Sequence, residues 1–150
     1  MDRSLNSLSS DFRPKVVELL AQLTERGIAV RIVQTARTLE EHHANLTSGA
    51  STTALSKHLP RRLRGFPATD PDLDKVDAID VCPYELYQLV GPDKLQWSDR
   101  ASPQAQAAFA VIGEVGERLG LRWGGRWVRP HDPGHLELVL PAPPPPTMAA

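Results

Sequence analysis

A histidine flanked by two acidic residues marks the most chemically suggestive stretch of this chain, Asp132-Pro-Gly-His135-Leu-Glu137-Leu. Leucines alternate with His135 and Glu137, so a strand here would turn its leucines to a core and its histidine and carboxylate to the opposite face. The proline and glycine upstream favour a turn that brings the Asp132 carboxylate close to the His135 ring. An acid and a histidine placed together at the start of a strand suggest a metal site with an adjacent proton acceptor.

Two other residues with metal-binding side chains lie in or beside expected strands. His58 ends the segment Ser56-Lys-His, and Asp80 sits among apolar neighbours in the strand expected over residues 76–82. A carboxylate buried without a partner is costly, so Asp80 needs either a cation or backbone donors. Two imidazoles and one carboxylate suit catalytic zinc, which keeps a fourth position for water and lowers the pKa of that water to roughly 7. Asp132 would accept the proton and pass it to a leaving amine.

Periodicity and capping signals predict the elements that must position these residues. An apolar stripe closed by a glycine predicts a helix over about 11–26, and a β-branched run predicts a strand over 28–34. Thr38, with Glu41 three positions later, opens a second helix, and Ser102 opens a third that ends near residue 119. We therefore expect an α+β fold, a small antiparallel sheet with helices packed on one side and the site on its open face.

Arg37 and the segment 59–77 are harder to interpret from local sequence. Arg37 lies at a strand-to-helix junction, where side chains commonly face a cleft, but a solvated surface arginine is the plainer interpretation. The segment 59–77 combines prolines, a basic cluster and an acidic run with little periodicity, and such a long loop is usually functional or mobile. We interpret its basic cluster as a solvated face. Residues 1–10 are expected to be loosely held, and the proline-rich residues 141–150 to form a disordered tail after a single domain at 1–140.

Composition restricts the class of protein. With 150 residues, of which 41% are hydrophobic and 23% charged, the chain is typical of one globular domain. A net charge of −1 gives no basic field for nucleic acid or anionic membrane. Cys82 is the only cysteine, which excludes an internal disulfide and a multi-cysteine zinc site. The chain has no apolar run for a membrane span and no signal-peptide core, so we expect a protein made in the cytoplasm that reaches an outside substrate after release. We also expect a monomer.

Four short motifs follow one another along the chain: Ser56-Lys-His58, Ala78-Ile-Asp80, Trp123-Gly-Gly-Arg-Trp127 and Asp132-Pro-Gly-His135. In this order and at these distances they resemble the zinc peptidases of the D-Ala-D-Ala carboxypeptidase and VanY group (M15 type). The likeness is greatest to the L-alanyl-D-glutamate peptidase endolysins of bacteriophages. The opening of the chain also matches, since Arg37 precedes a glutamate-rich helix, and the resemblance extends from about residue 11 to residue 140.

The resemblance implies a role for each matched residue. His58, Asp80 and His135 would bind one Zn2+, and Asp132 would be the general base. Arg37 would polarise the scissile carbonyl or hold a substrate carboxylate.

Other matched residues would act around this centre. Ser56 and Glu137 would orient the ligating histidines. Trp123 and Trp127 would wall the cleft, although a position in the core is at least as good an interpretation of each. Two departures from the family pattern stand out: residues 59–79 separate the first histidine from the aspartate, and Arg126 stands where the family often has an acid.

The implied activity is hydrolysis of the L-Ala–D-Glu bond in the peptidoglycan stem peptide by a hedgehog/DD-peptidase-like domain. Cleavage of D-Ala-D-Ala on the same site is one alternative. A zinc-containing module that binds the cell wall without cleaving it is another, and the presence of Asp132 argues against it. The plainest alternative has no metal, with two ordinary polar histidines and an Asp80 that bonds to the backbone.

Overall fold

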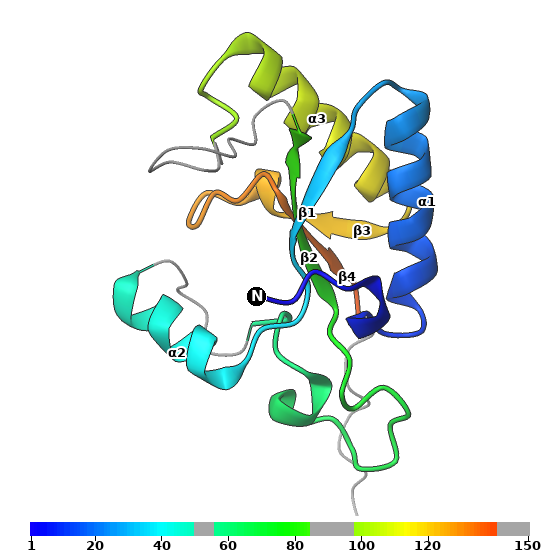
Figure 1. Ribbon diagram of the computed structural model, residues 1–150, viewed down its shortest axis with the longest axis vertical. Helices are drawn as coiled ribbons and strands as arrows, with labels where there is room; N and C mark the ends of the chain where they lie inside the picture. Colours follow the sequence, from blue (N-terminus) through cyan, green and yellow to red (C-terminus); the bar gives the residue numbers. More distant parts are fainter. Residues whose placement is uncertain (50–55, 85–97, 141–150) are drawn as a thin grey trace, which may run out of the picture.

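Three helices and a four-stranded antiparallel sheet make up the residues that this computed structural model describes, 1–49, 56–84 and 98–140 (Figure 1). The strand order is β1-β2-β4-β3. The helices are α1 (Phe12–Glu25), α2 (Leu39–Ser48) and α3 (Pro103–Arg118), and the strands are β1 (Val30–Gln34), β2 (Ala78–Pro83), β3 (Leu121–Trp123) and β4 (His135–Leu138). The expected α+β class is confirmed, whereas the proline-rich tail expected at 141–150 lies outside the described residues.

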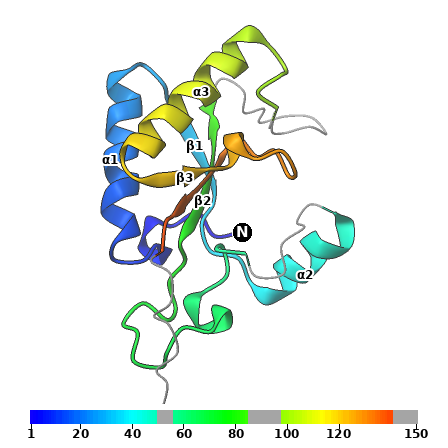
Figure 2. The same cartoon turned by 180° about the vertical axis from the view of Figure 1, so that it is seen from behind.

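The hydrophobic core lies between the sheet and the pair α1 and α3, which lie side by side while α2 stands apart from them (Figures 1 and 2). Phe12 and Phe109 supply its largest helical side chains, and Ile79 and Leu136 meet them from the central strands; all four are fully buried. Burial of such a side chain contributes about 1.5–3 kcal/mol. The single thiol, Cys82, belongs to this core, and burial raises its pKa to about 11. Because the core takes one face of the sheet, the other remains for polar side chains.

Capping residues fix the start of two helices, as the sequence predicts. Thr38 and Glu41 form the reciprocal capping box at the start of α2, and the Ser102 hydroxyl accepts a hydrogen bond from the Ala105 N–H at the start of α3.

No helix among the described residues combines the length and apolar character that a membrane span requires.

The N-terminal residues are tied to the rest of the chain, so the expectation that residues 1–10 are loosely held is wrong. Leu8 is almost fully buried in the core, and the Ser9 N–H donates to the carbonyl of Val76 at 3.0 Å. Further along, the Thr35 N–H donates to the carbonyl of Asp2 at 2.8 Å. These contacts join segments far apart in sequence, and periodicity within a ten-residue window does not reveal them.

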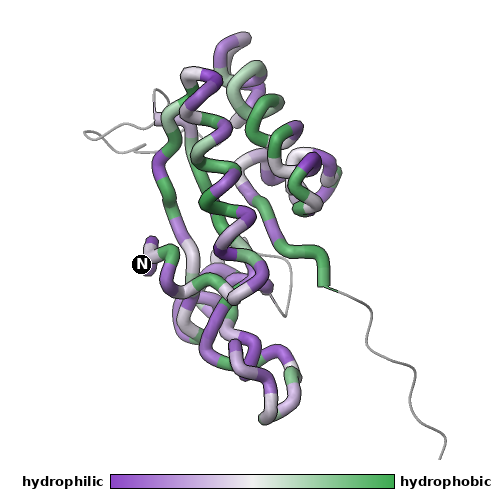
Figure 3. The backbone as a smooth tube through the Cα atoms, turned by 90° about the vertical axis from the view of Figure 1, so that its right-hand side faces the viewer, coloured by the Kyte–Doolittle hydropathy of each residue, from purple (hydrophilic) through white to green (hydrophobic). Residues whose placement is uncertain are grey.

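The segment 59–77, here called the excursion, leaves the sheet region and returns to it. Backbone hydrogen bonds join its two ends. The Arg61 N–H donates to the Lys75 carbonyl at 2.9 Å, and the Asp77 N–H donates to the Lys57 carbonyl at 3.0 Å. The excursion forms the lower end of the molecule in Figure 3, where hydrophilic residues predominate. The sequence separation that sets this chain apart from the family pattern is therefore closed in space.

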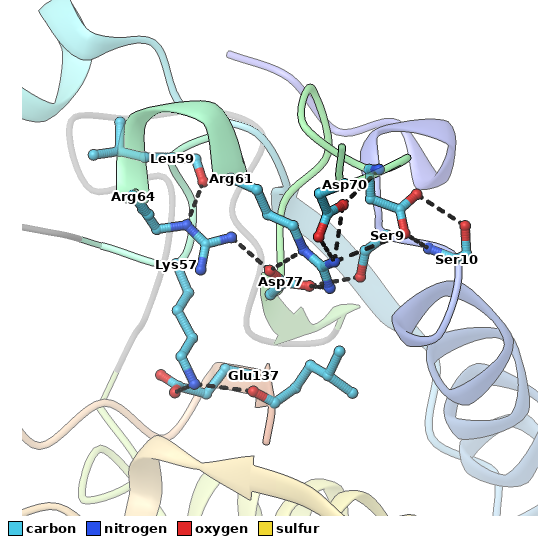
Figure 4. Close-up of polar contacts among 11 residues, drawn as sticks. Ser9, Ser10, Lys57, Leu59, Arg61, Arg64, Asp70, Asp77 and Glu137 are labelled. Carbon is cyan, nitrogen blue, oxygen red and sulfur yellow. Dashed lines mark hydrogen bonds and ion pairs between the residues drawn. The ribbon is translucent and has the colours of Figure 1, made fainter. Parts of the chain in front are cut away.

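A buried ionic cluster holds the excursion together (Figure 4). Asp77 is fully buried and accepts two hydrogen bonds from Arg61, both at 2.9 Å, and one each from Arg64 and Ser9. The interpretation of the basic cluster as a solvated face is therefore wrong for Arg61 and Arg64. It holds for Arg62, whose ion pair with an acidic partner is exposed. Burial alone would raise the pKa of Asp77, but the hydrogen bonds from Arg61, Ser9 and Arg64 outweigh it and leave the pKa below its ordinary value.

Replacement of Asp77 by asparagine should cost about 3 kcal/mol of unfolding free energy at neutral pH, because it leaves buried arginine charge uncompensated. The depressed pKa of the folded state means that this stabilisation is complete above the unfolded value near 3.8 and fades as the pH falls below it. Urea unfolding of wild type and Asp77→Asn between pH 7 and pH 3 tests this. A stability difference that stays constant over the whole range contradicts the assignment.

Candidate metal centre and active site

His58, Asp80 and His135 converge on the open face of the sheet. One ligand atom from each residue lies within 4.8 Å of the corresponding atoms of the other two. Asp80 and His135 are direct partners in the register of β2 and β4, so strand pairing alone brings them together. His58 comes just before the excursion. Because the ends of the excursion are hydrogen-bonded to each other, His58 lies near the start of β2. Three residues spread over 78 positions thus meet, as the motif order requires.

The ring of His58 has an orientation that calls for a cation. Its Nδ1 lies 2.7 Å from the carbonyl of Thr35, and because a carbonyl can only accept, Nδ1 carries the proton. In a ring that carries this single proton, Nε2 presents a lone pair. It is buried without a hydrogen-bond partner, 3.1 Å from Oδ1 of Asp80. A lone pair facing a carboxylate oxygen is repulsive, and a shared cation converts that repulsion into attraction. The donor set therefore fits a divalent metal ion with nitrogen and oxygen ligands, as zinc has.

The ring of His135 lies between two carboxylates. Nδ1 is 3.0 Å from Oδ1 of Asp80 and Nε2 is 2.9 Å from Oε1 of Glu137. Burial alone would lower the pKa of His135, but these two hydrogen bonds reverse the effect and raise it to about 10. The same Asp80 oxygen contacts both histidines, so Nδ1 is the His135 atom that faces the shared site. Nε2 is left to Glu137, which holds the ring in place.

Lys57 extends this arrangement by one residue. Its ammonium lies 2.6 Å from Oε2 of Glu137 and donates to the carbonyl of Leu138 at 2.9 Å. Burial would raise the pKa of Glu137, but hydrogen bonds with His135 and Lys57 lower it to about 2. Glu137 therefore stays ionised as an acceptor for His135. Sequence reasoning missed Lys57, because the only signal was its position between Ser56 and His58.

Asp132 stands at the edge of the site. Its Oδ2 is 4.0 Å from Nδ1 of His135, and its backbone carbonyl accepts a hydrogen bond from the His135 N–H at 3.1 Å. Burial raises the pKa of the Asp132 carboxyl above its ordinary value, and repulsion from Asp80 adds to this. A carboxylate with a raised pKa next to a metal site is a better proton acceptor than an ordinary one. This placement agrees with the turn expected from the proline and glycine at 133–134.

Arg37 is buried rather than solvated. Its guanidinium donates to Oε1 of Gln34 through Nε at 3.2 Å and Nη2 at 3.1 Å, and its backbone N–H donates to the carbonyl of His58 at 2.8 Å. Burial lowers the pKa of Arg37, whereas the negative charges of Asp80 and Asp132 oppose this. Its hydrogen-bonded side-chain partner is a neutral amide, and Asp80 and Asp132 of the site are close enough to attract its charge. The solvated-surface interpretation is therefore wrong.

The remaining predicted residues border the triad of His58, Asp80 and His135 in different ways. The Ser56 hydroxyl accepts a hydrogen bond from the His58 N–H at 3.2 Å, which supports the turn rather than the ring. The Trp127 ring lies against the His135 ring with centroids 5.0 Å apart. Trp123 packs against the core, and its Nε1 donates to the Pro133 carbonyl at 2.7 Å. Of the two tryptophans, Trp127 is the one in contact with a predicted ligand.

Removal of one ligand should abolish tight metal binding. We expect His58→Ala to lower zinc affinity by more than about 100-fold, because loss of a ligand exceeds the 10–100-fold effect typical of its outer partners. Competition with a chromophoric chelator at pH 7.5 measures the change. His43→Ala, which alters an exposed histidine of α2, is the matched control. If the two variants bind zinc equally well, His58 is not a ligand.

Comparison with known proteins gives a match to a protein family and matches among solved structures. A family profile described as D-alanyl-D-alanine carboxypeptidase matches residues 77–138, which contain Asp80, Asp132 and His135. Among solved structures, the chain matches the L-Ala D-Glu endopeptidase ChiX of Serratia marcescens with 19% identity and a TM-score of 0.51, over 90% of this chain and 83% of that one. No curated protein sequence matches the chain.

The family match and the structural match differ in extent and in what they show. At 19% identity the structural likeness establishes the fold, whereas the family profile is a match of sequence that includes two of the three triad residues. The resemblance to the M15-type peptidases is therefore confirmed. In sequence, residues 77–138 are similar to the family described as D-alanyl-D-alanine carboxypeptidase, and in fold most of the chain is similar to an L-Ala D-Glu endopeptidase.

Proposed function

We propose that this chain is a zinc-dependent peptidoglycan endopeptidase of the endolysin type, which hydrolyses the L-Ala–D-Glu bond of the stem peptide. One observation carries the proposal: the bare Nε2 of His58, the Oδ1 of Asp80 and the Nδ1 of His135 face one another in a buried cluster with Asp132 at its edge. The family profile supports a peptidase, and the shared fold with an L-Ala D-Glu endopeptidase supports the choice of bond.

His58, Asp80 and His135 would hold the zinc ion, which when bound supplies Lewis acidity that acidifies water and polarises a carbonyl. Asp132 accepts the proton of the attacking water at its carboxylate. It then delivers that proton to the amine of the leaving D-glutamate residue, so one group serves as base and then as acid. The raised pKa of Asp132 makes its carboxylate a stronger base for the first half of this exchange, and the protonated carboxyl group is still a much stronger acid than the ammonium of the leaving group.

Arg37 would stabilise the negative charge that grows on the carbonyl oxygen during attack. Its buried guanidinium is hydrogen-bonded to the neutral Gln34 amide and interacts electrostatically with Asp80 and Asp132 of the site. A charge fixed in a buried position acts without reorganisation when the transition state forms. The nearby carboxylates of Asp80 and Asp132 oppose the effect of burial on its pKa.

A D-Ala-D-Ala carboxypeptidase is the second candidate, and the description of the matching family profile favours it. The same metal centre and the same Asp132 would serve, with a different pocket for the residues on either side of the bond. End-group analysis of digested peptidoglycan separates the two activities. A new L-alanine carboxyl end with a new D-glutamate amine identifies the endopeptidase, and released free D-alanine identifies the carboxypeptidase.

The decisive variant is Asp132→Asn, which keeps the size of the side chain and removes its basicity. We expect it to lower kcat on peptidoglycan by about 10²–10⁴-fold, the usual contribution of a general acid–base group, while zinc content stays at the wild-type level. Turbidity loss of purified cell walls and metal analysis of both proteins provide the measurement.

Asp74→Asn is the matched control, since Asp74 is an exposed carboxylate of the excursion that pairs with the exposed Arg62. It should cleave at the wild-type rate. If wild type and Asp132→Asn both hold zinc and neither releases fragments, the chain is a zinc-containing wall-binding module and the peptidase proposal fails.

A further inference from the structure

We propose that Asp77 is a positioning residue for the metal centre. Together with Ser9, Arg61 and Arg64 it forms the Asp77 cluster, which would hold the three ligand-bearing segments in register with one another. This inference rests on the proposed zinc site and adds to it a residue that touches none of the reacting groups. The cluster is a set of buried charged and polar side chains that the chemistry at Asp132 and Arg37 does not use.

The backbone of Asp77 joins all three segments that carry a ligand. Its N–H donates to the carbonyl of Lys57 at 3.0 Å, next to His58, and its carbonyl accepts from the N–H of Leu138 at 2.9 Å, in β4 with His135. Asp77 itself precedes β2, three positions before Asp80. A shift of Asp77 would therefore move the two histidine-bearing segments relative to the aspartate.

The side chain of Asp77 fixes that backbone in place. Both carboxylate oxygens receive hydrogen bonds from Arg61 at 2.9 Å, Oδ1 receives the hydroxyl of Ser9 at 2.6 Å, and Oδ2 receives Arg64 (Figure 4). Arg61 and Arg64 follow His58 by three and six positions. Their bonds to Asp77 therefore close the excursion a few residues from each of its ends, where His58 and Asp80 lie.

Charge pairing of this kind is better suited to fixing geometry than to adding stability. Taking ions out of water costs about as much as their attraction returns, and well-packed apolar residues often stabilise a fold as much. A bidentate guanidinium–carboxylate pair, in contrast, fixes both distance and direction. The chain needs such a constraint here because 21 residues separate His58 from Asp80, and an unconstrained loop of that length would let the histidine drift.

A second connection runs from the same point to the other histidine. Lys57, whose carbonyl accepts from Asp77, also holds Glu137 through its ammonium, and Glu137 holds the ring of His135. Figure 4 shows Lys57 between the cluster and Glu137. The cluster thus reaches His135 by a path of direct contacts, in addition to the backbone bond at Leu138.

The test measures zinc affinity of the folded, full-length chain. Wild type, Asp77→Asn and the control Asp74→Asn are titrated with zinc against a chromophoric chelator at pH 7.5, at a temperature where circular dichroism shows each to be folded. We expect Asp77→Asn to bind zinc about 10–100-fold more weakly, the range found for residues that orient metal ligands. Asp74→Asn should bind like wild type, since its side chain is exposed and outside the cluster.

Cobalt substitution adds a readout that loss of stability alone does not move. The visible absorption of bound Co2+ reports the geometry of its ligands, so a folded Asp77→Asn protein should show a changed spectrum at saturation. If the cobalt spectrum of Asp77→Asn is that of wild type and its zinc affinity lies within twofold of wild type, the inference is overturned while the proposed function stays intact. Failure of wild type to bind zinc at all would overturn the proposed function, and the inference with it.

If Asp77→Asn does not fold, two milder variants decide the matter. Ser9→Ala removes one hydrogen bond to Oδ1, and Arg64→Gln removes one charged donor to Oδ2. Each should weaken zinc binding by a few-fold in a folded protein. Unchanged zinc affinity in both variants would overturn the inference.

Discussion

Two imidazole nitrogens share one carboxylate oxygen at the centre of this protein, and the rest of the structure serves that contact. Oδ1 of Asp80 is 3.1 Å from Nε2 of His58 and 3.0 Å from Nδ1 of His135. In a protein interior this arrangement is favourable only if something positive lies among the three atoms, either a proton or a metal ion. The Thr35 carbonyl contacts Nδ1 of His58 and Glu137 contacts Nε2 of His135, which leaves one nitrogen of each ring to face Asp80.

Two kinds of structure bring these three side chains together, pairing between strands and closure of a long loop. Strand pairing places Asp80 opposite His135, so these two meet wherever β2 and β4 pair in this register. His58 lies outside any strand, and its position depends on the closed excursion and on the Thr35 carbonyl at the end of β1. One face of the sheet packs on α1 and α3, and the site occupies the other. The rigid core therefore supports Asp80 and His135 directly and His58 through hydrogen bonds and ion pairs.

The sequence predicted the parts of this arrangement that follow from local pattern. Alternation of leucines around His135 and the apolar setting of Asp80 gave the strand faces, and capping signals gave the start of α2 and α3. Residue types beside expected strands suggested the set His58, Asp80 and His135, and the resemblance of four ordered motifs added an expected role for Arg37, which local sequence alone would leave on the surface. The orientation of His58 depends on the Thr35 carbonyl, a backbone group with no sequence signal.

Long-range pairing explains what the sequence did not predict. Arg61 and Arg64 look like solvated residues because their partner, Asp77, lies 13 or more positions away and is buried. The N-terminal segment looks loose because its contacts are with Val76 and Thr35. Both errors have the same cause: polar residues become structural when a distant partner accompanies them into the interior, and composition within one segment does not show this.

The buried thiol of Cys82 has a practical consequence. A thiol that is shielded from solvent and has a pKa of about 11 scarcely reacts with an alkylating reagent while the sheet is intact. Since it lies on β2, two residues beyond Asp80, alkylation of the chain requires that strand to open. The rate at which Cys82 is alkylated therefore reports how often the strand that carries Asp80 opens. Mass spectrometry can follow this rate without any introduced label.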